Sequence, residues 1–151
     1  VYGYGPGAIT FAGDSMKTLL GVLAGQLLCG QIGGYIAGLF VVVGHCWPVF
    51  DGFRGGKGVA SSYSIAIFTF PLGALGAILI GGVILLINKK MSIMSLAAML
   101  LFFLSTILFQ LSNLPLVILA GLLTIIVFVR HMENIQRLIH GEEQRLRKEG
   151  L

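Results

Sequence analysis

Three long stretches without a charged residue limit this chain more than any other feature. No Asp, Glu, Lys or Arg occurs in residues 18–50, 58–88 or 91–129. Of the 151 residues, 56% are hydrophobic and only 11% are charged, whereas soluble domains have about 25% charged residues. So few charged side chains do not cover the surface of a water-soluble domain of this length. The sequence therefore predicts a chain that lies mostly within a lipid bilayer.

Each uncharged stretch is too long for a single membrane crossing and is expected to hold a hairpin of two helices. As helices the stretches would extend about 46 to 58 Å, whereas the hydrocarbon core of a bilayer is about 30 Å thick. Gly or Pro interrupts each stretch near its middle, and both residues favour helix ends. The pattern predicts a single domain over residues 1–151, an all-α integral membrane protein of six hydrophobic helical segments arranged as three hairpins. The segments are expected at 15–28, 34–46, 57–69, 72–88, 92–110 and 115–130.

Charge placement predicts the orientation of these hairpins. Two crossings per stretch return every charged segment to one face of the membrane, namely 14–17, 51–57, 89–90 and 130–149. Because basic residues are in excess there, the positive-inside rule predicts that this face and the C-terminus are cytoplasmic. The net charge of +4 is dispersed between apolar stretches, which argues against nucleic-acid binding. Cys29 and Cys46 are expected on opposite faces and therefore unpaired.

A glycine-rich segment on the charged face has the composition of an anion site. Residues 55–58 read Gly-Gly-Lys-Gly and precede a predicted helix. Backbone N–H groups, a helix N-terminus and Lys57 together favour a bound phosphate. The nucleotide-binding P-loop pattern is absent, which disfavours ATP hydrolysis. An alternative is that Arg54 and Lys57 contact lipid phosphates beside an aromatic belt.

The C-terminal segment offers a second polar cluster. On a continuous helix Arg130, His131, Asn134 and Arg137 share one broad face, which suits an anion beside the glycine-rich segment. The alternative is an amphipathic helix lying on lipid headgroups. Ser92 and Ser95 are interpreted as a helix cap and a packing contact. Asp14 and Lys17 are expected at the start of the first helix, in a structural role.

Three segments together resemble one known family. They are residues 44–50, Gly-His-Cys-Trp-Pro-Val-Phe, residues 53–61, Phe-Arg-Gly-Gly-Lys-Gly-Val-Ala-Ser, and residues 130–138, Arg-His-Met-Glu-Asn-Ile-Gln-Arg-Leu, followed by Gly141 and Glu143. They resemble the second and third motifs of the PlsY family of bacterial acyl-phosphate:glycerol-3-phosphate acyltransferases. The chain lacks the first helix and the first, serine-bearing motif of that family, and it has Trp47 where the family usually has Phe.

The resemblance implies a seven-helix enzyme of the bacterial inner membrane whose active site faces the cytoplasm. It would transfer a fatty acyl group from acyl phosphate to the 1-hydroxyl of glycerol 3-phosphate, without a cofactor or metal, in contact with membrane lipid. An enzyme that makes acyl phosphate is the expected partner. The resemblance makes Lys57, His131 and Asn134 catalytic. It assigns substrate or phosphate binding to a larger set: Gly55, Gly56, Gly58, Arg54, His45, Ser61, Arg137 and Glu143.

A small membrane transporter or a lipid-binding module without turnover is the competing hypothesis. Transporters usually place an ionisable residue near the middle of the membrane. The charge-free stretches contain no Asp, Glu, Lys or Arg. Chemistry at the membrane surface is therefore favoured.

Overall fold

The computed structural model describes residues 4–145, and its regular elements are all helices. In chain order they are α1 (Tyr4–Cys46), a 3-10 turn η1 (Val49–Asp51), α2 (Val59–Thr69), α3 (Pro71–Asn88), α4 (Met91–Phe109), α5 (Leu114–Arg130) and α6 (Met132–Ile139). The predicted segments are recovered with small shifts of their ends, except that the first helix begins at Tyr4 and not near residue 15. Asp14 therefore lies inside a helix, and the predicted charged residues 146–149 lie outside the described part.

The predicted helix ends have local causes. Cys29 and Gly30 leave the helical region, and Gly30 has φ = +66°, so α1 folds back on itself as a hairpin. Pro71 stands in the first turn of α3, where its missing N–H costs nothing. At the start of α5 the Asn113 side chain accepts a hydrogen bond from the Leu116 N–H.

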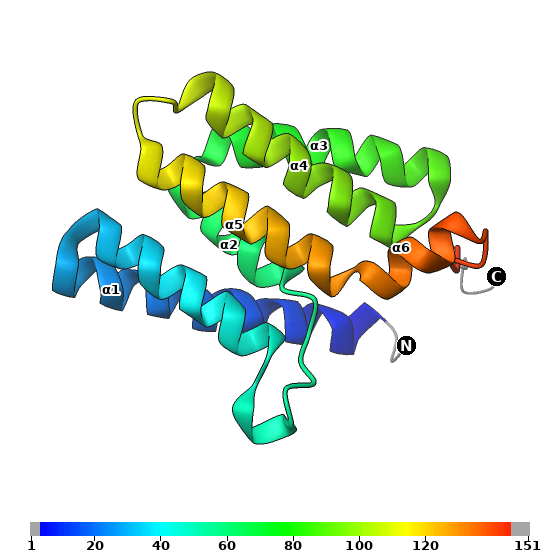
Figure 1. Cartoon of the computed structure of the whole chain (residues 1–151), viewed down its shortest axis with the longest axis horizontal. Helices are drawn as coiled ribbons and strands as arrows, with labels where there is room; N and C mark the ends of the chain where they lie inside the picture. The colour runs from blue at the N-terminus through cyan, green and yellow to red at the C-terminus, as the bar shows by residue number, and fades with distance from the viewer. Residues whose placement is uncertain (1–3, 146–151) are drawn as a thin grey trace.

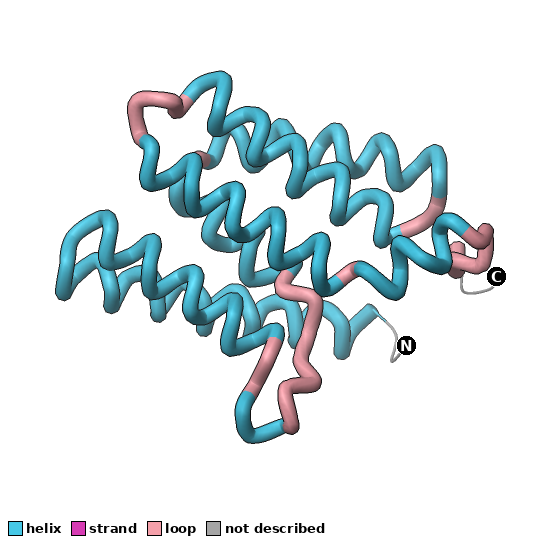
Figure 2. The backbone as a smooth tube through the Cα atoms, in the orientation of Figure 1, coloured by secondary structure: helices cyan, strands magenta, loops and turns pink. Residues whose placement is uncertain are grey.

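The helices form an elongated bundle, with the α1 hairpin on one side, α5 and α2 in the middle and the α3–α4 pair on the other side (Figure 1). The start of α1, the α3–α4 turn and α6 lie at one end of the bundle, and the α1 turn and the α4–α5 loop lie at the other. The α1–α2 connection leaves the bundle sideways (Figure 2). This arrangement confirms the predicted hairpins and places Lys89 and α6 at the same end.

By length and apolar composition, three helices of the described chain qualify as membrane spans, with the α5–α6 pair, bent by 60°, as a fourth. The first of these is α1, which contains two arms joined at Gly30. Helix α2 has 11 residues and is only about 16 Å long, which is short for a full crossing. Many large apolar side chains stay exposed on the outside of the bundle, Leu27, Leu86 and Leu108 among them. Such a surface suits a bilayer and not water.

The two arms of α1 touch through glycines. A Cβ atom on Gly25 would overlap the Gly33 carbonyl oxygen and lie 2.5 Å from the Ala37 Cβ. We therefore expect Gly25→Ala to lower the free energy of unfolding by about 1–3 kcal/mol, because the arms must separate. Gly76→Ala is the matched control, since nothing lies within 4 Å of a Cβ there. Equal unfolding midpoints for the two variants in detergent would contradict this prediction.

Candidate active site

The glycine-rich segment lies between the end of α1 and the end of α5. The Gly56 N–H donates to the His45 carbonyl oxygen (3.1 Å), and the Gly58 Cα is packed so that a Cβ would lie 2.8 Å from the Cys46 sulfur. Gly58 has φ = +73°, a left-handed conformation that favours glycine, and it directly precedes α2. The backbone N–H groups of Lys57 and Gly58 have no acceptor within the described part of the chain. The N–H groups of Lys57 and Gly58 are therefore free for a ligand, whereas the Gly56 N–H is held by the His45 carbonyl oxygen.

The first turn of α2 adds buried polar groups. The hydroxyls of Ser61 and Ser62 are fully buried and have no hydrogen-bond partner among the described residues. Leaving a buried hydroxyl unpaired costs about 1–3 kcal/mol. Both hydroxyls lie in the first turn of α2, beside its N-terminus.

A four-residue network stands at the same end of the bundle. The Asn134 Nδ2 donates to the Ser92 hydroxyl (3.0 Å) and to the Glu143 carboxylate (2.8 Å), and the Ser92 hydroxyl also donates to Glu143. The Arg137 Nε donates to the other oxygen of Glu143 (3.0 Å). Ser92 comes from α4, whose N-cap is Lys90, so its predicted capping role is wrong. Its place beside Asn134 follows from contacts between segments that are distant in the sequence.

Burial opposes ionisation of Glu143, but hydrogen bonds from Ser92, Asn134 and Arg137 outweigh it and lower the pKa from its ordinary 4.5 to about 2. A carboxylate with a lowered pKa stabilises the folded state above pH 4.5, and that stabilisation is lost as the pH falls towards 2. We expect the thermal unfolding midpoint to fall through this interval. Glu143→Gln should remove most of the dependence. Glu142→Gln, at the exposed neighbouring position, should leave the pH dependence of the unfolding midpoint unchanged. If Glu143→Gln showed the same pH dependence as the parent, Glu143 would not be its source.

His131 stands in the break between α5 and α6 and is 2% exposed. Its Nδ1 lies 2.8 Å from the Val127 carbonyl oxygen. Because a carbonyl only accepts, Nδ1 carries the proton, and in the neutral ring Nε2 has the lone pair.

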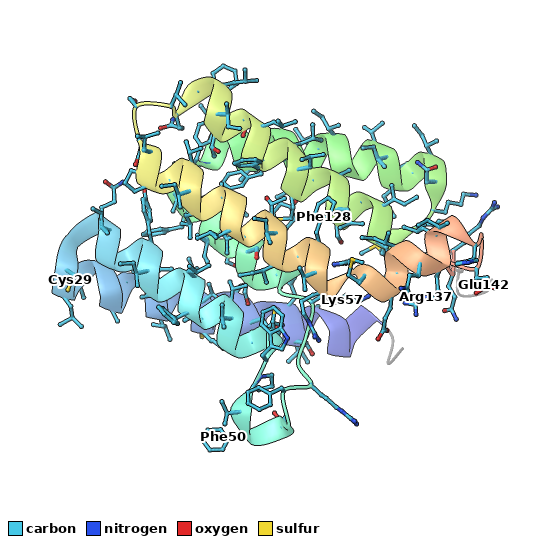
Figure 3. The ribbon with its side chains drawn as sticks, in the orientation of Figure 1. Cys29, Phe50, Lys57, Phe128, Arg137 and Glu142 are labelled. Atoms are coloured by element: carbon cyan, nitrogen blue, oxygen red, sulfur yellow. The ribbon has the colours of Figure 1, made fainter. Side chains whose placement is uncertain are left out.

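Lys57 lies beside the junction of α5 and α6, with Arg137 farther along α6 (Figure 3). Partial burial lowers the pKa of Lys57, while the charge of Glu143 acts in the opposite direction. The structure thus brings Lys57, His131, Asn134 and Glu143 to one end of the bundle, as predicted.

Other predicted residues are placed differently. The 60° bend after Arg130 breaks the continuous helix face that the sequence suggested. The Arg130 guanidinium points to the carbonyl oxygens of Gly55 and Gly56. His45 contacts Asp14 (3.2 Å) and Lys17 (3.1 Å), and it meets the glycine-rich segment through both its carbonyl oxygen and its ring. Arg54 is exposed, and its side chain forms no hydrogen bond or ion pair with the described residues, so it is not joined to the network. Within residues 4–145 no group of three His, Cys, Asp or Glu side chains is placed to hold a metal ion.

An apolar groove adjoins this polar end. It encloses about 400 Å³ between α4 and α5 and reaches Met132, the residue after His131. Its lining includes Phe103, Gly121 and Phe128. The same end of the bundle therefore has free N–H donors, charged groups and the end of an open apolar groove between α4 and α5.

Comparison with known proteins identifies the family. Residues 1–141 match the family model described as glycerol-3-phosphate acyltransferase. The chain is 38% identical to the glycerol-3-phosphate acyltransferase of Alkaliphilus metalliredigens over 92% of this chain and 70% of that protein, and 35% identical to that of Geobacillus kaustophilus over 99% and 76%.

Solved structures agree. The fold is similar to crystal structures of PlsY, an integral membrane glycerol 3-phosphate acyltransferase, in its glycerol 3-phosphate form (TM-score 0.84, 30% identity, 93% of this chain and 71% of that one) and in its lysophosphatidic acid form (TM-score 0.83, 31% identity, 92% and 71%). The resemblance found in the sequence motifs is confirmed, and this chain is an integral membrane protein of the glycerol-3-phosphate acyltransferase family.

Proposed function

We propose that this chain transfers a fatty acyl group from acyl phosphate to the 1-hydroxyl of glycerol 3-phosphate, giving lysophosphatidic acid and inorganic phosphate. The observation that carries the proposal is that free backbone N–H donors beside Lys57 lie at the same end of the bundle as the apolar groove that ends at Met132. One substrate is an anion, and the other joins an anion to an alkyl chain. Both chemical requirements are met at one end of the bundle.

In the reaction, the glycerol hydroxyl oxygen attacks the acyl carbonyl carbon, and the bond from that carbon to the phosphate oxygen breaks. The hydroxyl proton passes to a phosphate oxygen, so atoms and charge balance. Acyl phosphate is already activated, and the protein has mainly to hold two anions in contact and stabilise negative charge as it develops.

We assign the roles as follows. Lys57, with the N–H groups of residues 57 and 58 and the Ser61 hydroxyl, binds phosphate. The His131 Nε2 accepts a hydrogen bond from the glycerol hydroxyl and orients it. Asn134, held by Ser92 and Glu143, faces the substrates, and Arg137 holds Glu143. His45 supports the glycine-rich segment.

Phosphate release tests the proposal. The chain is reconstituted in vesicles and mixed with long-chain acyl phosphate and glycerol 3-phosphate, with the full-length Alkaliphilus metalliredigens relative as the positive control. Release that requires both substrates, with formation of lysophosphatidic acid, is the expected result. Substrate binding without release, in a preparation where the relative is active, would contradict it.

We propose in addition that the polar end faces the cytoplasm in the bacterial inner membrane, where an acyl-phosphate-producing enzyme supplies the donor. Cys29 is exposed at the opposite end. A membrane-impermeant thiol reagent applied outside whole cells should label Cys29. It should not label a Lys89→Cys variant that also carries Cys29→Ser, and labelling of both from outside would contradict this orientation.

A further inference from the structure

Arg130, the last residue of α5, makes a two-pronged contact with the glycine-rich segment. Its Nε donates to the Gly56 carbonyl oxygen (3.0 Å), and its Nη2 donates to the Gly55 carbonyl oxygen (2.8 Å). The guanidinium carbon also lies 5.5 Å from the centre of the Trp47 ring, within the range of a cation–π interaction. Arg130 thus binds the backbone of the segment on one side and an aromatic ring from the α1–α2 connection on another.

These contacts orient the peptide groups of the segment. In a trans peptide the carbonyl and the N–H point in opposite directions, and the described chain has no cis peptide bond. Because the Gly56 carbonyl points to Arg130, the Lys57 N–H in the same peptide group points away from Arg130. That N–H has no acceptor among the described residues. Two carbonyl oxygens that would repel a bound anion are therefore turned away from the open donor and neutralised by a cation.

The opposite side of the segment is fixed as well. The Gly56 N–H is held by the His45 carbonyl oxygen. A Cβ on Gly56 would overlap the His45 ring, and a Cβ on Gly55 would overlap the His45 carbonyl oxygen. The segment is pressed between His45 and Arg130, and only glycine fits at both positions.

We propose that Arg130, supported by Trp47, is a positioning residue that holds residues 55–58 in their phosphate-binding shape and is not itself a substrate ligand. The inference rests on the proposed function, since it explains how the anion site is kept open. A guanidinium is required for this role, because its planar fork reaches two carbonyl oxygens and stacks on an aromatic face, whereas a lysine ammonium is a single point charge.

Arg130→Lys tests the fork while it keeps the charge. We expect the Kd for glycerol 3-phosphate, measured by isothermal titration calorimetry on the reconstituted chain, to rise about tenfold or more. KM should rise by a similar factor, with a smaller change in kcat and an unchanged unfolding midpoint. Arg145→Lys, an exposed position outside the site, is the matched control and should bind as the parent does.

Two variants of Trp47 test the contact between Arg130 and the Trp47 ring, and they provide the test of the positioning role if Arg130→Lys does not fold. Trp47→Phe keeps a ring under the guanidinium and should stay within about threefold of the parent Kd. Trp47→Leu removes the ring and should weaken binding more than Trp47→Phe does. Equal affinity of these two variants would overturn the support by Trp47.

The outcomes separate this inference from the proposed function. If the parent chain releases phosphate and Arg130→Lys has the same Kd and KM as the parent, the positioning role is wrong and the proposed acyl transfer still holds. If Arg130→Lys binds glycerol 3-phosphate more weakly than the parent but the parent chain never releases phosphate, the positioning role is supported and the proposed acyl transfer is wrong. A parent chain that does not bind glycerol 3-phosphate overturns the positioning role.

Discussion

Lys57→Ala is expected to lower the rate of acyl transfer by at least about 10²-fold while the bundle stays folded. Lys57 is the cation within the glycine-rich segment, and the backbone N–H groups of residues 57 and 58 beside it have no acceptor in the described chain. Removing one group that stabilises developing negative charge costs about 10²–10³-fold in rate in well-studied enzymes. The measurement is phosphate release by the reconstituted variant at saturating acyl phosphate.

Lys89→Ala is the matched control for this loss of charge. Lys89 is exposed in the α3–α4 turn at the same end of the bundle and is not part of the proposed site. Its removal should leave the rate unchanged, because a general change in surface potential is a small effect at physiological ionic strength. A fully active Lys57→Ala variant, or an equal loss in both variants, would remove Lys57 from the proposed site.

The second large effect is expected at His131, where two amide substitutions separate its two nitrogens. An Asn amide has its donor near the Nδ1 position and should keep the bond to the Val127 carbonyl oxygen, but it lacks any group at Nε2. A Gln amide places its terminal oxygen near Nε2. We expect His131→Asn to lower kcat by about 10²-fold or more and His131→Gln to lose less, because the proposed role belongs to the Nε2 lone pair.

His140 provides a control with the same local geometry. Its Nδ1 also lies 2.8 Å from the carbonyl oxygen four residues earlier, that of Gln136, but the side chain is exposed. His140→Asn should therefore retain full activity and the parental unfolding midpoint. Parental activity in His131→Asn, or a larger loss in His131→Gln than in His131→Asn, would contradict the assignment to Nε2.

The helix segments were predictable because their causes are local. Charge-free stretches longer than one membrane crossing require a reversal, and the residues that allow it stand in the sequence at Gly30, Pro71 and Asn113. The start of α1 was predicted about ten residues too late, because the local sequence there argues against a helix. Residues 4–14 contain glycines that weaken a helix prediction, yet a helix in which Asp14 pairs with Lys17 continues through them.

The candidate site was predictable in its residue types and not in its contacts. The motifs indicated Lys57, His131, Asn134 and Glu143, and the hairpins required them to meet at one end of the bundle. Helical spacing then placed Arg130 on the same face as Asn134, which is wrong because the chain bends by 60° after α5. Residues that would share one face of a straight helix point in different directions when the helix bends between them.

Ser92 is a second case in which spacing along the sequence did not predict the contacts of a side chain. Nothing within ten residues of Ser92 indicates a polar partner, and its position two residues after Lys90 suggests a cap. The structure joins it to Asn134 and Glu143, 42 and 51 residues away. Spacing and composition report forces that act along one segment, such as hydrophobic burial and backbone preference. Which side chains of different helices come within hydrogen-bonding distance depends on how the whole bundle packs, and only the three-dimensional arrangement contains that information.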